Sequence, residues 1–399
     1  MSQAVAVQPR GHGLNFGERP MLVFWEVTRS CLLSCRHCRA SAIATALPGE
    51  LSASEGRELA RQVAAFGRPY PILVMTGGDC LMRPDIHELA AYAVGLGIPV
   101  ALSPSVTPLL TPEAAVRIKA TGVRAVSISL DGAQARTHDT VRGVPGHFAK
   151  TVDALRMLKG SGLKVQVNTT VMRDNVEELA DVAALMESIG VDMWEVFFLV
   201  SVGRGEDVEP ITPREHEEVC HFLFDASRYG FVVRTVEAPF FRRVVRWRRG
   251  LDDDVEVANA FGLGSLYGRL EARLRVLLGP GVARPAAQSA STRDGKGIVF
   301  VAHDGDVHPA GFLPVTLGNV RERPLADIYR DSDLLNRIRG AQFSGRCGIC
   351  EFKDLCGGSR SRAFATFGDA LAEDPACNYV PALGLLPTTV RRRAACPRP

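Results

Sequence analysis

Seven of the ten cysteines in this 399-residue chain fall into two groups whose spacing suits metal chemistry. The first cysteine group is Cys31, Cys35 and Cys38, with the spacing C-x3-C-x2-C. The second cysteine group is Cys347, Cys350, Cys356 and Cys377, which opens with C-x2-C. A disulfide framework is typical of small secreted chains, and the N-terminal residues lack the apolar stretch of a secretory signal. Clustered thiols in a large chain without such a signal indicate metal or iron–sulfur ligation.

The first cysteine group lies on one short loop, where three thiolates can bind three irons of a [4Fe–4S] cluster. The fourth iron then lacks a protein ligand, and an open coordination position is typical of catalytic metal sites. The alternative is a zinc ion held by the three cysteines and by His37 or His12. We favour the cluster, because structural zinc sites prefer paired C-x2-C units.

Strand and helix patterns alternate from about residue 21 to 200, and the first cysteine group directly follows the first strand. Short apolar runs predict six strands, at residues 22–27, 72–75, 99–102, 125–130, 165–171 and 194–200. Helical spacing lies between them, and Ser52 and Glu55 form a capping box before one such helix. Six strand–helix units predict an α/β fold with a parallel sheet. They favour a partial (β/α)6 TIM-like barrel, because a closed barrel needs eight.

The rest of the chain predicts a second, smaller unit. Residues 236–297 contain a basic run, Arg242–Arg249, and a Gly/Pro-rich stretch, and we interpret them as a basic, variable linker or lid. Two short strand patterns flank Asp304-Gly305 as in a hairpin, and a helix is expected near Leu325–Ile338. The predicted division is a flexible N-terminus (1–20), a barrel (21–235), the linker or lid (236–297), a small cysteine-rich α+β domain (298–380) and a flexible tail (381–399).

Composition limits the classes of partner. The chain has 47 Lys and Arg against 44 Asp and Glu, and the net charge of +3 argues against a strongly basic nucleic-acid scaffold. No uninterrupted apolar run of about 18 residues is present, so we expect no membrane span. We predict a cytoplasmic protein that binds neither nucleic acid nor membrane.

The spacing of the first cysteine group resembles the hallmark of the radical SAM superfamily. That resemblance implies the partial (β/α)6 barrel and a cluster whose open iron binds the amino and carboxylate groups of S-adenosylmethionine (SAM). It also implies reductive cleavage of SAM to a 5′-deoxyadenosyl radical, which abstracts hydrogen from a substrate. His37 departs mildly from the family pattern, because many members carry an aromatic ring directly before the third cysteine.

The same resemblance implies SAM contacts at the carboxyl ends of the strands, the functional face of such barrels. After the second strand, Gly77-Gly78-Asp79 is similar to the family's GGE segment. The contacts expected after the later strands are Ser103 and Ser105, Ser129 and Asp131, Asn168 and Thr170, and Leu199. Each of these, taken alone, is also compatible with an ordinary strand end.

The four thiols of the second cysteine group can enclose one iron–sulfur cluster or one zinc ion, and spacing alone does not separate the two. Beside a radical SAM barrel, the pattern resembles the SPASM domain, which carries up to two auxiliary [4Fe–4S] clusters. Three cysteines of that pattern are absent: apolar residues stand before the Asp304-Gly305 turn, and Ala310 and Arg360 take the other two places. In relatives those three serve the first auxiliary cluster. The resemblance therefore implies two [4Fe–4S] clusters in total, one open and one closed.

Three cysteines remain outside the two groups. Cys220 fits a core thiol on an apolar helix, and Cys396 lies in the tail. Cys80 adjoins Asp79 at the expected catalytic end. Simple packing is the favoured interpretation of Cys80, and donation of a hydrogen atom to the substrate is the alternative.

The expected substrate is an anionic small molecule or a tetrapyrrole. The segments GGD, SPSVTP and DPxC are similar to those of the haem-synthesis members of the family, in which propionate side chains are decarboxylated. The basic run, with Arg360 and Arg362, can bind carboxylates, although a solvated helix face is the favoured interpretation of the run itself. A ribosomal-peptide maturase is the second interpretation, and a non-catalytic iron–sulfur or zinc protein is the third. The chemistry also needs a reductant such as flavodoxin or ferredoxin.

Overall fold

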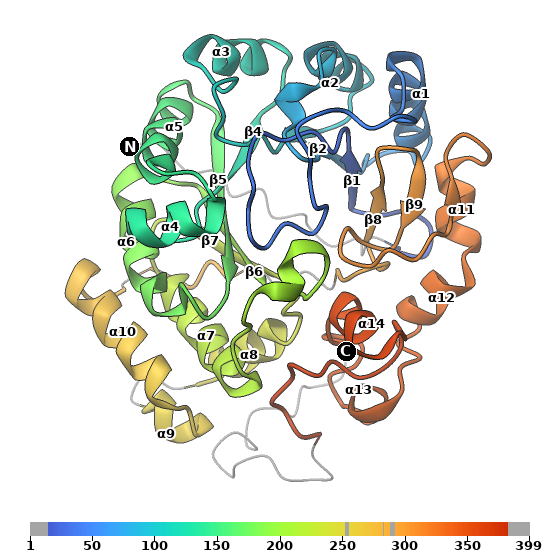
Figure 1. Ribbon diagram of the computed structural model, residues 1–399. Helices are drawn as coiled ribbons and strands as arrows, with labels where there is room; N and C mark the ends of the chain where they lie inside the picture. Colours follow the sequence, from blue (N-terminus) through green and yellow to red (C-terminus); the bar gives the residue numbers. More distant parts are fainter. Residues whose placement is uncertain (1–14, 252–254, 282, 288–291, 382–399) are drawn as a thin grey trace.

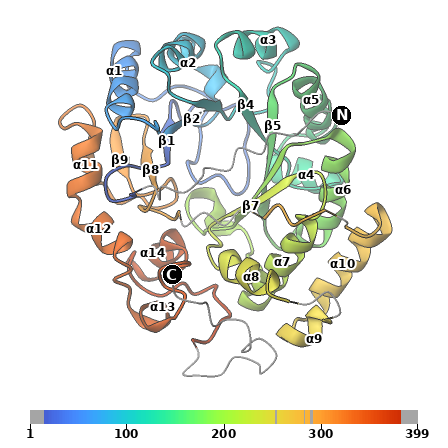
Figure 2. The same ribbon diagram turned by 180° about the vertical axis from the view of Figure 1, so that it is seen from behind.

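A single ten-stranded sheet with the order β10-β9-β8-β1-β2-β3-β4-β5-β6-β7 organises the molecule, seen from the two sides in Figures 1 and 2. The computed structural model describes residues 15–251, 255–281, 283–287 and 292–381. Most of the predicted flexible N-terminus and tail, and Cys396, lie outside the described residues. The strands are β1 Leu22–Glu26, β2 Ile72–Thr76, β3 Val100–Leu102, β4 Ala125–Ser129, β5 Lys164–Val171, β6 Met193–Phe198, β7 Val232–Val236, β8 Ile298–Val301, β9 Asp306–His308 and β10 Gly318–Asn319.

The six strands predicted from sequence are β1 to β6, and they pair in parallel in chain order, which confirms the partial barrel. Two further parallel strands flank them. β7 pairs with β6, and β8 pairs with β1 from Leu22–Trp25 to Ile298–Val301. The predicted hairpin is β8 and β9, which pair antiparallel. The C-terminal part of the chain therefore begins inside the barrel sheet.

Helices surround the sheet in Figure 1, and the loop between β1 and α1, in blue, lies across the centre of the ring. The barrel helices are α1 Ala53–Ala64, α2 Ile86–Gly95, α3 Pro112–Ala120, α4 Ala135–Arg142, α5 His147–Gly160, α6 Leu179–Ile189 and α7 Pro213–Ala226. The later helices are α8 Phe241–Arg248, α9 Val257–Phe261, α10 Ser265–Leu278, α11 Leu325–Asp331, α12 Asp333–Arg339, α13 Gly345–Ile349 and α14 Arg360–Phe367. Short 3-10 turns are η1 Cys80–Met82, η2 Val176–Glu178 and η3 Gly203–Asp207.

Local signals account for where several helices begin. Ser52 and Glu55 form both bonds of the predicted capping box at α1, and Thr212 and Glu215 do the same at α7. The helix expected near residues 325–338 is divided into α11 and α12, because the Ser332 side chain accepts the amide of Leu335 and starts a new helix.

In its described residues, the segment interpreted as a linker or lid contains the helices α8, α9 and α10, and α10 packs on the outside of the barrel. Arg269 and Arg273 on α10 form ion pairs with Glu177 and Asp181. Among the described residues, no helix is long and apolar enough to cross a membrane.

Alternate strand residues face opposite sides of the sheet. Trp25 is fully buried against α1, where a Cβ on Gly56 would lie 2.7 Å from its ring. On β5, Val165 and Val167 are buried on the same outer side, whereas Gln166 and Asn168 remain partly accessible. At β5 the inner face of the curved sheet is therefore polar and partly open to solvent, as a binding surface requires.

Candidate metal centres

The first cysteine group sits on the loop directly after β1, with Cys31 and Cys35 buried and Cys38 partly exposed. The amide of Leu33 points at Cys31 Sγ (3.4 Å), and Ser105 Oγ lies 3.8 Å from the same sulfur. Arg204 fixes the loop from the segment after β6, because its Nε donates to the Cys35 carbonyl at 2.9 Å and its amide donates to Cys38 O at 3.1 Å. Donors directed at sulfur are what thiolate ligands need.

An arginine that the sequence analysis did not identify lies against this group. Arg142, at the end of α4, donates from Nη1 to Cys35 Sγ at 3.4 Å, and its Nη2 lies 2.5 Å from Asp131 Oδ2. Both side chains are buried. Burial disfavours the charge on Asp131, but Arg142 and the Thr170 amide together hold the pKa of Asp131 below its usual value. A carboxylate that is buried at a strand end needs a cation beside it. The position of Asp131 at a strand end was therefore the sequence signal for a partner such as Arg142.

Asp131, predicted to contact SAM, is thus occupied within the protein. Its Oδ1 accepts the Thr170 amide at 2.7 Å, and His37 Nε2 lies 3.7 Å from its Oδ2. Burial lowers the pKa of His37 to about 4, so this imidazole is neutral near pH 7. Behind Asp131, the buried His138 and His147 form a short chain in which the Asp131 amide donates to His138 Nδ1 and the two rings meet at 2.9 Å.

Gly77-Gly78-Asp79 joins the end of β2 to the loop before Cys31. A Cβ on Gly77, whose φ is +149°, would lie 2.3 Å from the Thr28 carbonyl oxygen. The Asp79 carboxylate is fully buried and accepts the amides of Leu81 and Ser105 and the hydroxyl of Thr107. Burial raises the pKa of Asp79 despite these bonds. In the described contacts, Asp79 holds the segment after β3 in place.

The other predicted contact residues lie at neighbouring strand ends on the inner face. Ser129 and Asn168 are register partners on β4 and β5, and Asn168 Oδ1 accepts from Gln166 at 2.8 Å. Ser103 Oγ lies 2.6 Å from Ser127 Oγ, and Ser105 Oγ donates to Gly78 O. Leu199 is buried after β6, and its carbonyl accepts from Arg362 at 3.4 Å. The structure therefore brings Ser129 and Asn168 together and leaves both partly accessible.

The four thiols of the second cysteine group line one cavity, together with Arg243, Asp374 and Tyr379. Three amides point at the sulfurs at 3.4 Å: Phe352 at Cys350, Gly358 at Cys356 and Asp374 at Cys347. Burial raises the pKa of Cys356 to about 11 in the metal-free protein. The bonds to sulfur and the shared cavity fit a thiolate-bound group.

The thiol arrangement bears on the choice between zinc and a cluster. Among the described residues, no three histidine, cysteine or carboxylate side chains are gathered as one metal ion requires. A mononuclear zinc would need sulfur atoms about 2.3 Å from one centre. Among the described residues, the thiols are therefore not gathered in the arrangement of a mononuclear zinc site.

The places of the absent SPASM cysteines are filled. Ala310 packs with Leu313 and Ala370 in a small apolar cluster. Arg360 is fully buried, donates from Nη1 to the carbonyls of Ala370 and Ala372, and points Nη2 at Cys347 Sγ (3.7 Å). An arginine and apolar side chains occupy the space in which a further cluster would need ligands.

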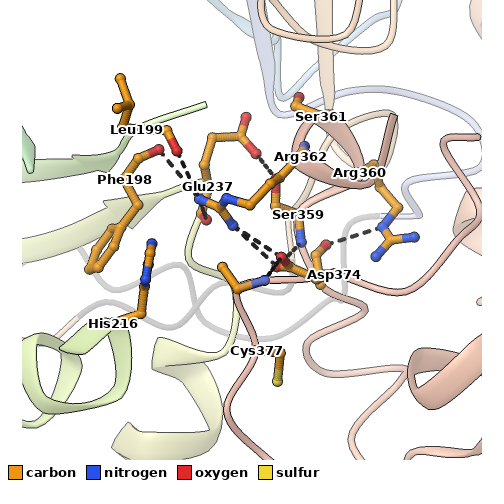
Figure 3. A network of polar contacts seen from close by, with 12 residues as sticks. Phe198, Leu199, His216, Glu237, Ser359, Arg360, Ser361, Arg362, Asp374 and Cys377 are labelled. Atoms are coloured by element: carbon orange, nitrogen blue, oxygen red, sulfur yellow. Dashed lines mark hydrogen bonds and ion pairs between the residues drawn. The ribbon is translucent and has the colours of Figure 1, made fainter. Parts of the chain in front are cut away.

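The arginines that were considered for substrate binding are largely engaged inside the protein. In the basic run, Arg243 pairs with Glu217 (2.6 Å), and Arg248 pairs with Asp225. Figure 3 shows Arg362 between Asp374 and the backbone of Phe198, Leu199 and Glu237. Arg243 and Arg248 are therefore buried in ion pairs and do not form an open anion site, whereas Arg246 and Arg249 remain exposed. The acidic partners, Glu217 and Asp225, lie on α7. The sequence next to the run gives no sign of them.

The two isolated cysteines within the described residues are core thiols. Cys220 on α7 and Cys80 at η1 are both fully buried, and burial raises their pKa well above the usual value. Packing accounts for both.

Comparison with known proteins places these features in a family. Residues 25–186 match the model of the radical SAM superfamily, and residues 293–353 match that of the SPASM iron–sulfur cluster-binding domain. An AdoMet-dependent heme synthase of Nitratidesulfovibrio vulgaris is 39% identical over 90% of this chain and 92% of the relative. One from Methanosarcina barkeri is 35% identical over 91% and 97%. Streptococcus suis SuiB bound to S-adenosylmethionine has the same fold, with a TM-score of 0.67, 14% identity, and coverage of 91% of this chain and 78% of SuiB.

Proposed function

The chain belongs to the radical SAM superfamily and carries a SPASM domain, and from this premise we propose that it removes hydrogen from a carboxylate-bearing tetrapyrrole, in the manner of a haem-synthesis enzyme. The family is that of enzymes that use SAM and iron–sulfur clusters. The names of the two heme synthases, which align over nine-tenths of this chain, support the substrate class.

We assign one [4Fe–4S] cluster to each cysteine group, with Cys31, Cys35 and Cys38 leaving one iron open and Cys347, Cys350, Cys356 and Cys377 closing the other. When bound, the open cluster would supply the electron for reductive cleavage of SAM. SAM would supply the radical that abstracts hydrogen from the substrate. Arg142 and Arg204 orient the loop of the first group, and Gly77 and Gly78 allow that loop to approach β2. The filled positions of Ala310 and Arg360 support a single auxiliary cluster.

For SAM itself we propose the inner-face hydroxyls and amide of Ser103, Ser129 and Asn168, with the backbone at Leu199. These groups lie at neighbouring strand ends, where a ligand on the open iron can reach several of them. Asp79 and Asp131 act on the SAM site indirectly. The Asp79 carboxylate holds the segment at Ser105, and the Asp131 carboxylate holds Arg142.

The observation that carries the substrate proposal is a basic and aromatic set on the inner face beside β8. The Arg39 guanidinium lies 4.6 Å from the ring centre of Phe300, 5.9 Å from that of Phe312 and 3.1 Å from Glu26. His308 is the register partner of Phe300 and shares its face. His303 donates a hydrogen bond from Nδ1 to the Glu26 carboxylate, which raises the pKa of His303, so this one carboxylate faces both Arg39 and His303. A flat aromatic ring with acidic side chains matches this set.

The test is an anaerobic reaction of the reconstituted holoenzyme with SAM, a reductant and an iron coproporphyrin. We expect 5′-deoxyadenosine together with a tetrapyrrole lighter by one CO2 and two hydrogen equivalents for each propionate converted. Production of 5′-deoxyadenosine with unchanged porphyrin would reject the tetrapyrrole as the substrate. The absence of any 5′-deoxyadenosine would reject radical SAM activity itself. Flavodoxin or ferredoxin is the proposed electron donor, and oxygen-sensitive clusters support a cytoplasmic location.

Iron analysis tests the assignment of the two cysteine groups. The wild type is expected to hold about eight irons, falling to about four when Cys31, Cys35 and Cys38 are all replaced by Ala. Replacing Cys347 and Cys350 should also leave about four. Cys220→Ala, in the core, should leave the count unchanged.

A further inference from the structure

The two cysteine groups are joined through one short segment, Phe198–Arg204, which runs from the end of β6 into η3. At one end of it, Arg204 binds the carbonyls of Cys35 and Ala42 and Gly203 packs against the carbonyl of Cys38. At the other end, the carbonyls of Phe198 and Leu199 accept hydrogen bonds from Arg362 at 3.5 and 3.4 Å. The segment thus contacts the loop of the first group and the C-terminal domain at once.

Arg362 connects this segment to the second cysteine group through Asp374 (Figure 3). Its Nη1 lies 3.2 and 3.3 Å from the two oxygens of the Asp374 carboxylate, and its Nη2 also donates to Glu237 O at 2.9 Å. The Asp374 amide donates to Cys347 Sγ, and its carboxylate accepts the amides of Ser359 and Ala376. One guanidinium therefore bonds to both the barrel and the residue that bonds to a thiol of the second group.

Burial makes this connection stiff. Asp374 is fully buried and Arg362 nearly so, which means that neither charge can exchange its partner for water without a large cost. His216 stacks on Phe198 with ring centres 5.2 Å apart, and burial lowers its pKa to about 4, so it stays neutral beside Arg362. Ser359 Oγ donates to the Glu237 carboxylate and closes the network from the side of β7.

From this geometry we propose that Arg362 is a positioning residue that couples the two sites: occupation of the second cysteine group by its cluster strengthens SAM binding at the first. This rests on the proposed function only in that SAM binds at the first group. A cluster that fixes Cys347 also fixes Asp374, Arg362 and the end of β6. Without a cluster on Cys347, fewer bonds hold the Asp374 end of this connection, and SAM binding then has to supply more of the order. Such coupling is reciprocal and can be measured as a non-additive effect.

The experiment is a double-mutant cycle on the dissociation constant of SAM, measured by anaerobic equilibrium dialysis without reductant or tetrapyrrole. The four proteins are wild type, Cys350→Ala, Arg362→Gln and the double variant. We expect Cys350→Ala, which lacks the auxiliary cluster, to bind SAM at least fivefold more weakly. Arg362→Gln should weaken binding similarly while it keeps the wild-type iron content, and the double variant should be no weaker than either single variant.

Arg346→Gln is the matched control. Arg346 also touches the second group, through Cys377 O and Glu373, but none of its described contacts reaches the barrel. Its SAM affinity should stay within twofold of wild type. Arg362→Lys is the second variant if Gln fails to fold, because an ammonium keeps the charge and cannot span Asp374 and the carbonyls together. We expect it to keep its iron and to weaken SAM binding as Gln does.

Three results overturn the coupling. The first is a cluster-free Cys350→Ala protein that binds SAM as tightly as wild type, and the second is a pair of effects that simply multiply in the double variant. The third is an Arg362→Lys protein with full iron content and wild-type affinity. Failure of the substrate proposal is seen separately, since it leaves SAM binding intact and removes only the tetrapyrrole product. Failure of the wild-type holoenzyme to bind SAM would reject both.

Discussion

Arg142 donates a hydrogen bond to the thiol of Cys35 across 3.4 Å while its other terminal nitrogen lies 2.5 Å from the Asp131 carboxylate. The pair is buried, so solvent screens these charges little. A positive charge held beside a cluster ligand stabilises the added electron of the reduced cluster, and the paired carboxylate limits that effect. Arg142 and Asp131 are therefore expected to set the potential of the first cluster.

Arg142→Gln should lower the midpoint potential of the first cluster, and Asp131→Asn should raise it. The loss of a charge-assisted bond of about 1.5–3 kcal/mol corresponds to roughly 60–130 mV for one electron, as an upper range. Potentiometric titration followed by EPR spectroscopy measures both. Arg36→Gln is the control, because Arg36 lies on the same loop but is exposed and pairs with Asp174. Shifts of the same sign in the two buried variants would contradict the assignment.

Gly78 governs the approach of the β2 loop to the first cysteine group. A Cβ there would lie 2.2 Å from the Ser30 carbonyl oxygen and 2.6 Å from its carbon, and both are backbone atoms that cannot turn aside. Gly78→Ala should therefore displace the residues before Cys31, and iron should fall from about eight to about four per chain while the second group keeps its cluster. Gly95→Ala, on α2 with open space at its Cβ, should keep all the iron. A full iron content in Gly78→Ala would show that the loop can move without losing the cluster.

The sequence predicted the six strands β1 to β6, both cysteine groups and the capping box at α1, because these depend on short-range patterns. Gly77 and Gly78 were predicted as SAM contacts. In the structure they allow a close approach to the backbone of Thr28 and Ser30. Asp131 was placed at the correct strand end, but its partner Arg142 is eleven residues further along, on α4. The roles of Arg243 and Arg362 depend on Glu217 and Asp374, and only the folded chain brings these partners together.

The strand count shows the same limit. β7 reads VVRTV, which is short and interrupted by Arg234, and β8 was expected to open a separate domain. β7 depends on pairing with β6, and β8 depends on pairing with β1, which lies near the other end of the chain. Pairing between strands leaves little signal in the local sequence.

Arg39 is expected to contribute to binding of the proposed tetrapyrrole. Replacing it with Met removes the cation beside Phe300 and one of the positive charges that face Glu26, so an anionic substrate should bind at least tenfold more weakly. Arg39→Lys should recover part of the affinity, since it restores the charge without the planar fork. Absorbance titration with an iron coproporphyrin, without SAM, measures the dissociation constant. Arg36→Met should bind as wild type does, and equal affinities in Arg39→Met and Arg36→Met would remove Arg39 from the substrate site.

Glu237 should make the stability of the protein depend on pH. Burial and the nearby Asp294 raise its pKa to about 8, although Ser359 and Arg362 also face it. Between pH 4.5 and 8 the folded protein then holds a proton that the unfolded chain, with the usual glutamate value of 4.5, has released. Stability should therefore fall as pH rises through this window, by up to a few kcal/mol.

Glu237→Gln keeps the shape and removes the titration, so its unfolding temperature should change less between pH 5.5 and 8. Glu58→Gln, at an exposed position paired with Arg61, should follow the wild type. Parallel pH profiles for wild type and Glu237→Gln would show that Glu237 is not the group that makes stability depend on pH.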